Sequence, residues 1–76
     1  LLRTVSINLN IAGVAGAASA RVTVKSPSGA ATVYTCTTSP CTVSIDRRQG
    51  AHAYTLEYLS GSGAVLARSA SHLIRE

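Results

Sequence analysis

The 76-residue chain contains no Trp, Phe or Met, and only 13% of its residues are charged. Because 46% of the residues are hydrophobic, this composition excludes an acidic or polar disordered tail. No apolar run approaches the roughly 18 residues that a membrane span needs, so we expect none. The length allows one small domain, residues 1–76, whose aliphatic core should be marginal without a further staple.

Clustered charge and catalytic motifs are also missing. Seven basic residues against three acidic ones give a net charge of +4, but the basic residues are scattered and the only aromatics are three tyrosines. Nucleic-acid grooves couple clustered Lys and Arg to aromatic stacking platforms, so we expect no nucleic-acid partner. Asp46, His52 and a serine form a triad only on paper, because no Gly-x-Ser-x-Gly elbow is present. We therefore expect no enzymatic activity and no cofactor.

The two cysteines are the expected staple. Cys36 and Cys41 flank Thr-Thr-Ser-Pro, a turn-forming segment between two strand-like runs, so their side chains should meet as a disulfide. Zinc would need four ligands, and the spacing of His52 and His72 fits no common finger, so we expect no metal site. Disulfides persist in oxidising compartments, which predicts an extracellular or cell-surface location, with the periplasm as a further option.

Alternation of apolar and polar residues predicts about six strands, most of them separated by turn-forming segments. The clearest is the first, in which Val5, Ile7, Leu9 and Ile11 share one face and no charge interrupts residues 4–11. The expected strands cover residues 3–11, 21–25, 32–36, 41–45, 52–59 and 64–72.

The segments between these strands complete the prediction. Residues 12–20 are small and contain two glycines, so we expect a flexible tether there. Residues 64–74 also carry helix-forming Ala, Leu and Arg, which leaves a C-terminal helix as an alternative. Short strands at roughly 10-residue spacing predict an all-β fold, a small antiparallel Ig-like β-sandwich.

Several short motifs resemble the PEGA domain over residues 21–60. They are Pro27-Ser28-Gly29-Ala30, Thr32-Val33-Tyr34, the step Thr38-Ser39-Pro40 into the strand 41–45, and the Gly-led strand 50–56. Ser28 replaces the family's usual acid, and Gly61-Ser62-Gly63 stands where the family often shows Gly-Tyr. The resemblance implies a non-catalytic β-sandwich module of cell-envelope or surface proteins, with residues 21–76 as its core and no family-wide ligand.

The first strand carries our leading functional hypothesis. Edge strands are normally protected by Lys, Pro or a bulge, and residues 4–11 have none of these. The strand could pair within its own domain, or the apolar residues Val5, Ile7, Leu9 and Ile11 could serve a neighbouring copy by strand exchange or edge addition. We therefore expect a structural module that contacts itself or other cell-envelope proteins, as in a surface filament or layer.

Two other hypotheses remain open at the sequence level. Arg47, Arg48, His52 and Tyr58 could together present forked donors and a ring to an anion or a glycan, as in a carbohydrate- or cell-wall-binding accessory domain. The chain could also be an inert spacer of a larger protein, a hypothesis that rests on its abrupt ends at Leu1 and Glu76.

Overall fold

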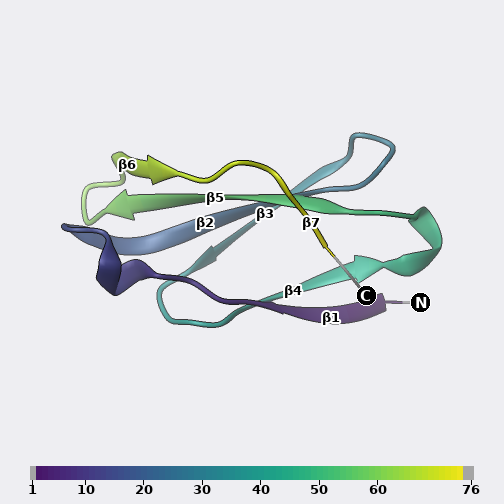
Figure 1. The fold of residues 1–76 in the computed structure, drawn as a ribbon, viewed down its shortest axis with the longest axis horizontal. Coiled ribbons are helices and arrows are strands. Elements are labelled where there is room, and N and C mark those ends of the chain that lie inside the picture. The colour runs from purple at the N-terminus through teal and green to yellow at the C-terminus, as the bar shows by residue number, and fades with distance from the viewer. Residues whose placement is uncertain (1, 75–76) are drawn as a thin grey trace.

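A computed structural model describes residues 2–74, except for the side chain of Arg47. Within this range the fold is all-β, with seven strands and two single-turn 3-10 helices (Figure 1). The strands are β1 (Leu2–Ile7), β2 (Ala17–Lys25), β3 (Ala31–Cys36), β4 (Cys41–Asp46), β5 (Ala53–Ser60), β6 (Val65–Arg68) and β7 (His72–Leu73). The 3-10 helices are η1 (Ile11–Gly13) and η2 (Arg47–Gln49).

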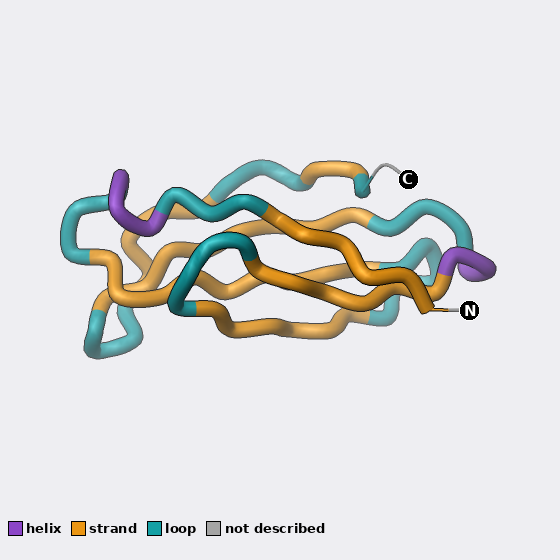
Figure 2. Tube along the Cα trace, turned by 90° about the horizontal axis from the view of Figure 1, so that it is seen from below, coloured by secondary structure: helices purple, strands orange, loops and turns teal. Residues whose placement is uncertain are grey.

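The described strands form two antiparallel sheets of unequal size. The large sheet has the strand order β3-β2-β5-β6, with β7 also pairing with β5, whereas the small sheet contains only β1 and β4. Figure 1 shows β1 and β4 together along one side of the molecule, and Figure 2 looks from that side. The chain crosses between the sheets from β1 to β2, from β3 to β4 and from β4 to β5. The small sheet packs over the large one as an antiparallel β-sandwich, as the sequence predicts.

The core lies between the sheets because inward positions of β2 and β4 alternate with polar ones. Val22 on β2 and Val43 on β4 are almost fully buried, while Thr42 and Ser44 between the β4 core residues are exposed. The alternation places every second side chain on the same face of its strand. The main buried cluster contains Ile7, Val22, Val24, Cys41, Val43, Ile45, Leu56 and Ile74.

Two of the segments between the expected strands form hydrogen-bonded turns. Gly29 donates its N–H to the carbonyl oxygen of Ser26 over 3.0 Å, and Gly63 does the same to Ser60 over 2.9 Å. Both glycines have φ values above +90°, a region that other residues avoid.

The structure differs from the sequence expectation at both ends of the chain. The first strand ends at Ile7 instead of residue 11, and β2 already begins at Ala17, so the expected tether 12–20 is shortened by η1 and the start of β2. Residues 64–74 contain no helix; they form β6 and β7, separated at Ser69. There the Ser69 N–H donates to the Leu56 carbonyl and the Ser69 hydroxyl accepts from the Leu56 N–H, each over 2.9 Å. The Ser69 hydroxyl thus takes the place of a backbone carbonyl as the acceptor for Leu56, and the strand is interrupted between β6 and β7.

Candidate assembly interface

The small sheet places β1 against β4 in a continuous antiparallel register, with Thr4 opposite Ser44 and Val5 opposite Val43. In an antiparallel ladder, the N–H and C=O of one residue point to the same side of the strand, and successive residues alternate sides. The orientation of a single residue therefore determines which backbone groups of both strands remain outside the ladder.

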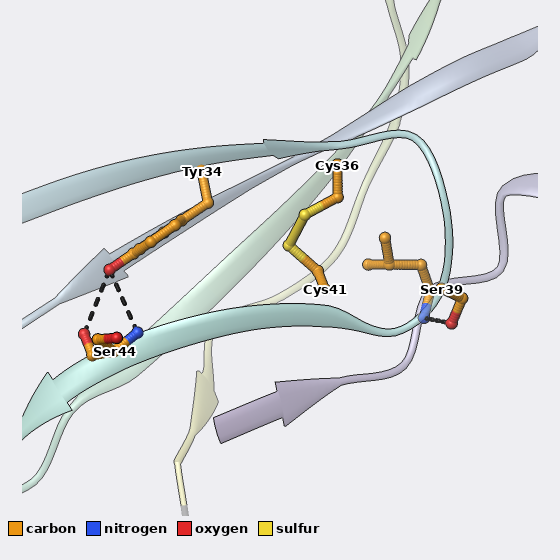
Figure 3. The surroundings of a disulfide bond; sticks show 6 residues. Tyr34, Cys36, Ser39, Cys41 and Ser44 are labelled. Carbon is orange, nitrogen blue, oxygen red and sulfur yellow. Dashed lines mark hydrogen bonds between the residues drawn. A yellow bond between two sulfur atoms is a disulfide. The ribbon is translucent and has the colours of Figure 1, made fainter. Parts of the chain in front are cut away.

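Tyr34 reveals that orientation (Figure 3). Its hydroxyl donates to the Ser44 carbonyl oxygen over 3.2 Å and accepts from the Ser44 N–H over 3.3 Å. Since Tyr34 lies on β3, both backbone groups of Ser44 point away from β1. The residue opposite, Thr4, must likewise point its N–H and C=O away from β4, together with Leu2 and Ser6.

Two further hydrogen bonds show that the alternation continues beyond β1. The Leu9 N–H donates to Ser39 Oγ, in the loop before β4, over 2.9 Å. The next N–H, that of Asn10, donates to the Tyr58 hydroxyl on β5 over 3.0 Å. By this alternation the outward groups of the first segment are those of residues 2, 4, 6 and 8, and the row ends where Tyr58 engages Asn10. Among residues 2–74, no strand pairs with this edge.

A groove lies beside the open edge of β1. It has a volume of about 360 Å³ and is lined by residues 5–8 together with Tyr54, Leu73 and Ile74. Ile74 is buried, but the Leu73 side chain next to it is 67% exposed. The groove thus combines backbone of β1 that no strand within residues 2–74 pairs with, polar side chains of residues 6 and 8, and apolar side chains of residues 73 and 74.

The structure places three of the four residues predicted to form an assembly strand in or against the core, and the fourth outside β1. Ile7 is buried in the core, and Val5 and Leu9 pack against the same cluster. Ile11 lies in η1 and is half-buried. Three of the four side chains therefore help to fill the chain's own sandwich, while the backbone beside them stays available at the edge.

The far edge of β4 contrasts with the edge of β1. At its middle the Tyr34 hydroxyl occupies both backbone groups of Ser44. At its start, a disulfide joins Cys41 to Cys36 on β3, with Cα atoms 5.8 Å apart, which confirms the predicted pairing. β3 thus covers β4 through one hydroxyl and one covalent bond (Figure 3).

The structure does not bring the predicted ligand residues together. His52 is buried just before β5, where its Nδ1 lies 3.0 Å from the Gly50 carbonyl oxygen that accepts its hydrogen bond. Tyr58 lies six residues further along, which corresponds to about 20 Å of extended strand, and its hydroxyl is engaged by Asn10. Arg48 is exposed in η2, where it contacts Asp46, whereas the side chain of Arg47 lies outside the described residues.

Two carboxyl groups, those of Asp46 and Glu57, have lowered pKa values. A hydrogen bond from the Arg48 N–H lowers the pKa of the Asp46 carboxyl. On the outer face of the large sheet, Glu57 accepts from Arg21 Nε and from Arg68 Nε, each over 2.8 Å. The hydrogen bond from Arg21 is the main cause that lowers the pKa of Glu57. Sequence reasoning missed this cluster because its members lie on three different strands.

Other site classes receive no support from the described part of the chain. It holds no group of three or more His, Cys, Asp or Glu residues placed to bind a metal ion. No helix within residues 2–74 is long and apolar enough to cross a membrane. Comparison of the chain with protein-family models, curated proteins and solved structures found no match.

Proposed function

We propose that this chain is a non-catalytic extracellular structural module, a repeating subunit that contacts other subunits through its N-terminal strand β1. The observation that carries the proposal is that no strand within residues 2–74 pairs with the outer edge of β1, which lies beside a groove lined by both polar and apolar residues. Unpaired strand edges are templates for another chain, and β1 contains neither Lys nor Pro; its one charged residue, Arg3, stands next to its first residue.

Two features support the extracellular part of the proposal. The Cys36–Cys41 disulfide is of the kind that persists in oxidising environments. The resemblance of residues 21–60 to the PEGA domain fits a module of cell-envelope or surface proteins. Both features are independent of the outer edge of β1. If the extracellular location were disproved, the proposed assembly role of β1 would still stand.

The strand can connect subunits in two ways. In strand exchange, β1 of one copy pairs with β4 of another, and the buried contacts of Ile7 are made by the same residue from a neighbour. In edge addition, β1 stays on its own β4 and accepts a further strand on its open side. These two modes predict different covalent products when β1 is fixed to β4.

Sedimentation velocity of the purified chain over a wide concentration range is the first test. We expect assemblies that grow with concentration, whereas a monomer at every concentration would contradict the proposal. The double variant Thr4→Cys/Ser44→Cys then tests the mode, because these residues are opposite each other and exposed. Thr4 and Ser44 form a non-hydrogen-bonded pair, because the backbone groups of each residue point away from the other strand. The Cα atoms of such a pair are about 4.5 Å apart, which is close enough for a disulfide.

Non-reducing electrophoresis of the oxidised double variant separates the outcomes. Strand exchange gives chains linked in covalent ladders, because the thiol introduced on β1 of one copy meets the thiol introduced on β4 of the next. Edge addition gives single covalent chains that still associate in the centrifuge. The two single variants, Thr4→Cys and Ser44→Cys, are the controls for cross-linking that does not require the β1–β4 register.

A further inference from the structure

We infer that the outer face of the large sheet is a binding site for an acidic polysaccharide whose charged groups are carboxylates. The face carries cationic side chains around one carboxylate, beside a small cavity lined by hydroxyl-bearing residues. It lies on the side of the large sheet that the small sheet does not cover, so this inference goes beyond the proposed association through β1 and does not depend on it.

The alternation and register of the large sheet set which residues share this face. On β2 the outward residues are Arg21, Thr23 and Lys25, because the two valines between them are buried. The pairing of β2 with β5 places Thr55 and Glu57 on the same face, opposite Thr23 and Arg21. Four residues of strand span about 13 Å, so the face has a cation at each end of a row with threonines in the middle.

The outer face has an excess of positive charge. Among residues 2–74 it carries Arg21, Lys25 and Arg68 but only one carboxylate, that of Glu57. The other described acid, Asp46, lies at the end of β4 in the small sheet. An anionic chain that carries charges along its length therefore complements this face and can reach both of its ends.

Glu57 fixes two guanidinium groups and leaves one of them with donors to spare. Its Oε1 accepts from Arg21 Nε and Nη2, and its Oε2 accepts from Arg68 Nε. The Nη groups of Arg68 have no partner within residues 2–74, and its side chain is 70% exposed. Such a guanidinium fork binds a carboxylate through two parallel hydrogen bonds. A carboxylate is also the anion that both arginines already contact.

A cavity of about 150 Å³ occupies the middle of the outer face. Its lining includes Lys25 and three hydroxyl-bearing residues, Thr23, Thr55 and Ser71. None of these three hydroxyls has a hydrogen-bond partner within the described residues. Because a hydroxyl both donates and accepts, the cavity can exchange hydrogen bonds with sugar hydroxyl groups while the cations bind the carboxylates.

The backbone of the face favours a sugar chain over an acidic peptide. β2 pairs with β3 on one side and with β5 on the other, so its N–H and C=O groups are used within the sheet. A peptide that binds through main-chain hydrogen bonds needs a strand edge, which the middle of the sheet lacks. Tyr54, the one aromatic residue in the lining, packs against the core cluster and offers no stacking platform for nucleobases.

Fluorescence anisotropy of labelled polygalacturonate, titrated with the purified chain, tests the inference. The contacts are exposed, so we expect binding that is lost when NaCl rises from about 0.01 M to about 1 M, as the screening length falls from about 30 Å to about 3 Å. Neutral dextran is the uncharged control and should not bind. Dextran sulfate and poly-glutamate are the probes for a sulfated sugar chain and for an acidic peptide.

Two substitutions test the site itself. Arg68→Gln removes the guanidinium fork and should raise the dissociation constant for polygalacturonate roughly tenfold. Arg48→Gln makes the same change of charge at an exposed arginine of η2, outside this face, and is the matched control.

Thr55→Val removes a cavity hydroxyl and should raise the dissociation constant for polygalacturonate about threefold while leaving that for poly-glutamate unchanged. Thr42→Val, at an exposed position of β4, is its control. The melting temperature shows whether all four variants remain folded.

Each outcome decides the inference. A loss in Arg68→Gln that Arg48→Gln does not share, with a loss in Thr55→Val for polygalacturonate alone, supports it. Equal losses in Arg68→Gln and Arg48→Gln mean attraction to the net charge and overturn the site. Poly-glutamate that binds as tightly and depends equally on Thr55 overturns the sugar chain as occupant.

Two further results would also overturn the inference. One is dextran sulfate that binds through Arg68 while polygalacturonate does not bind, and the other is no binding of polygalacturonate even at about 0.01 M NaCl. Sedimentation velocity measures association through β1 separately, so failure of the titrations leaves the proposed function standing. A chain that is monomeric at every concentration but binds polygalacturonate overturns the proposed function and leaves this inference standing.

Discussion

The two edges of the small sheet have similar lengths but different protection. β1 and β4 each have six residues, and within the described chain each pairs with the other and with no further strand. The edge of β4 is engaged by Tyr34 and tied at its start by the Cys36–Cys41 disulfide, whereas no strand within residues 2–74 pairs with the outer edge of β1.

Edge protection therefore need not come from the edge strand itself. β4 carries no Lys or Pro, and its covering groups come from β3. A tyrosine hydroxyl can accept and donate, so it satisfies the N–H and C=O of one residue as a neighbouring strand would. Four predictions test how far the contrast between the two edges holds.

The largest effect should come from the inward face of β1. Ile7 is only 4% exposed and belongs to the core, so Ile7→Ala should lower the free energy of unfolding by about 3 kcal/mol. Leu2→Ala, at a side chain that is 77% exposed on the same strand, should change stability by less than about 0.5 kcal/mol. Urea denaturation measures both. Equal effects of the two substitutions would mean that β1 is not anchored through Ile7.

Removing the disulfide should have the next largest effect. Cys36→Ala/Cys41→Ala opens a loop between residues five positions apart, and the chain-entropy model predicts a loss of about 2 kcal/mol. The same change releases the start of β4 from β3, so we expect association at the β4 edge to increase. Urea denaturation gives the first quantity and sedimentation velocity the second. Unchanged association would show that Tyr34 alone is sufficient to cover β4.

The sequence predicts the fold class and the disulfide because both depend on local patterns. Strict alternation along residues 41–45 identifies the β4 face, and Thr-Thr-Ser-Pro between two strand-like runs identifies the cysteine pair. The turns ending at Gly29 and Gly63 are local as well, since each needs a positive φ.

The open edge is harder to predict because its limits are set by distant residues. Alternation in the sequence continues to Ile11, but the strand ends at Ile7 and the following N–H groups bond to side chains 30 and 48 residues away. The protection of β4 likewise depends on a hydroxyl ten residues earlier, Tyr34, whose role no periodicity reveals. Similarly, the sequence groups Arg48, His52 and Tyr58 as neighbours, whereas extended β5 separates Tyr58 from the other two.

Tyr34→Phe should lower stability less than the two changes above, and it should make the β4 edge available for association. It removes the hydroxyl that engages Ser44, which should cost about 1 kcal/mol. The β4 edge then exposes an N–H and a C=O at its middle, so assemblies larger than those of the native chain should appear. Thr35→Val, which removes an exposed hydroxyl from the next position on β3, is the control. Identical sedimentation of the two variants would show that the Tyr34 hydroxyl does not protect the edge.

The smallest effect on stability is expected from lowering the pH. It distinguishes the two edges because Asp46 titrates at the end of β4. The pKa of Glu57 is lowered in the folded chain, chiefly by the hydrogen bond from Arg21, and the pKa of Asp46 at the end of β4 is lowered by the Arg48 N–H. Each group therefore contributes stability above its unfolded pKa, 4.5 for Glu57 and 3.8 for Asp46, and this contribution is lost as the pH falls through the folded pKa.

Melting temperatures between pH 6 and pH 2 measure this loss. Glu57→Gln should flatten the part of the dependence that belongs to the large sheet, and Asp46→Asn the part that belongs to the β4 edge. The β1 edge has no titrating group at Leu2, Thr4 or Ser6, so its pairing should stay constant in the same range for as long as the chain remains folded. A dimer whose dissociation constant followed the protonation of Asp46 would place the contact on β4 and not on β1. The pH profile of association, compared with the pH profile of stability, thus identifies which of the two edges is used.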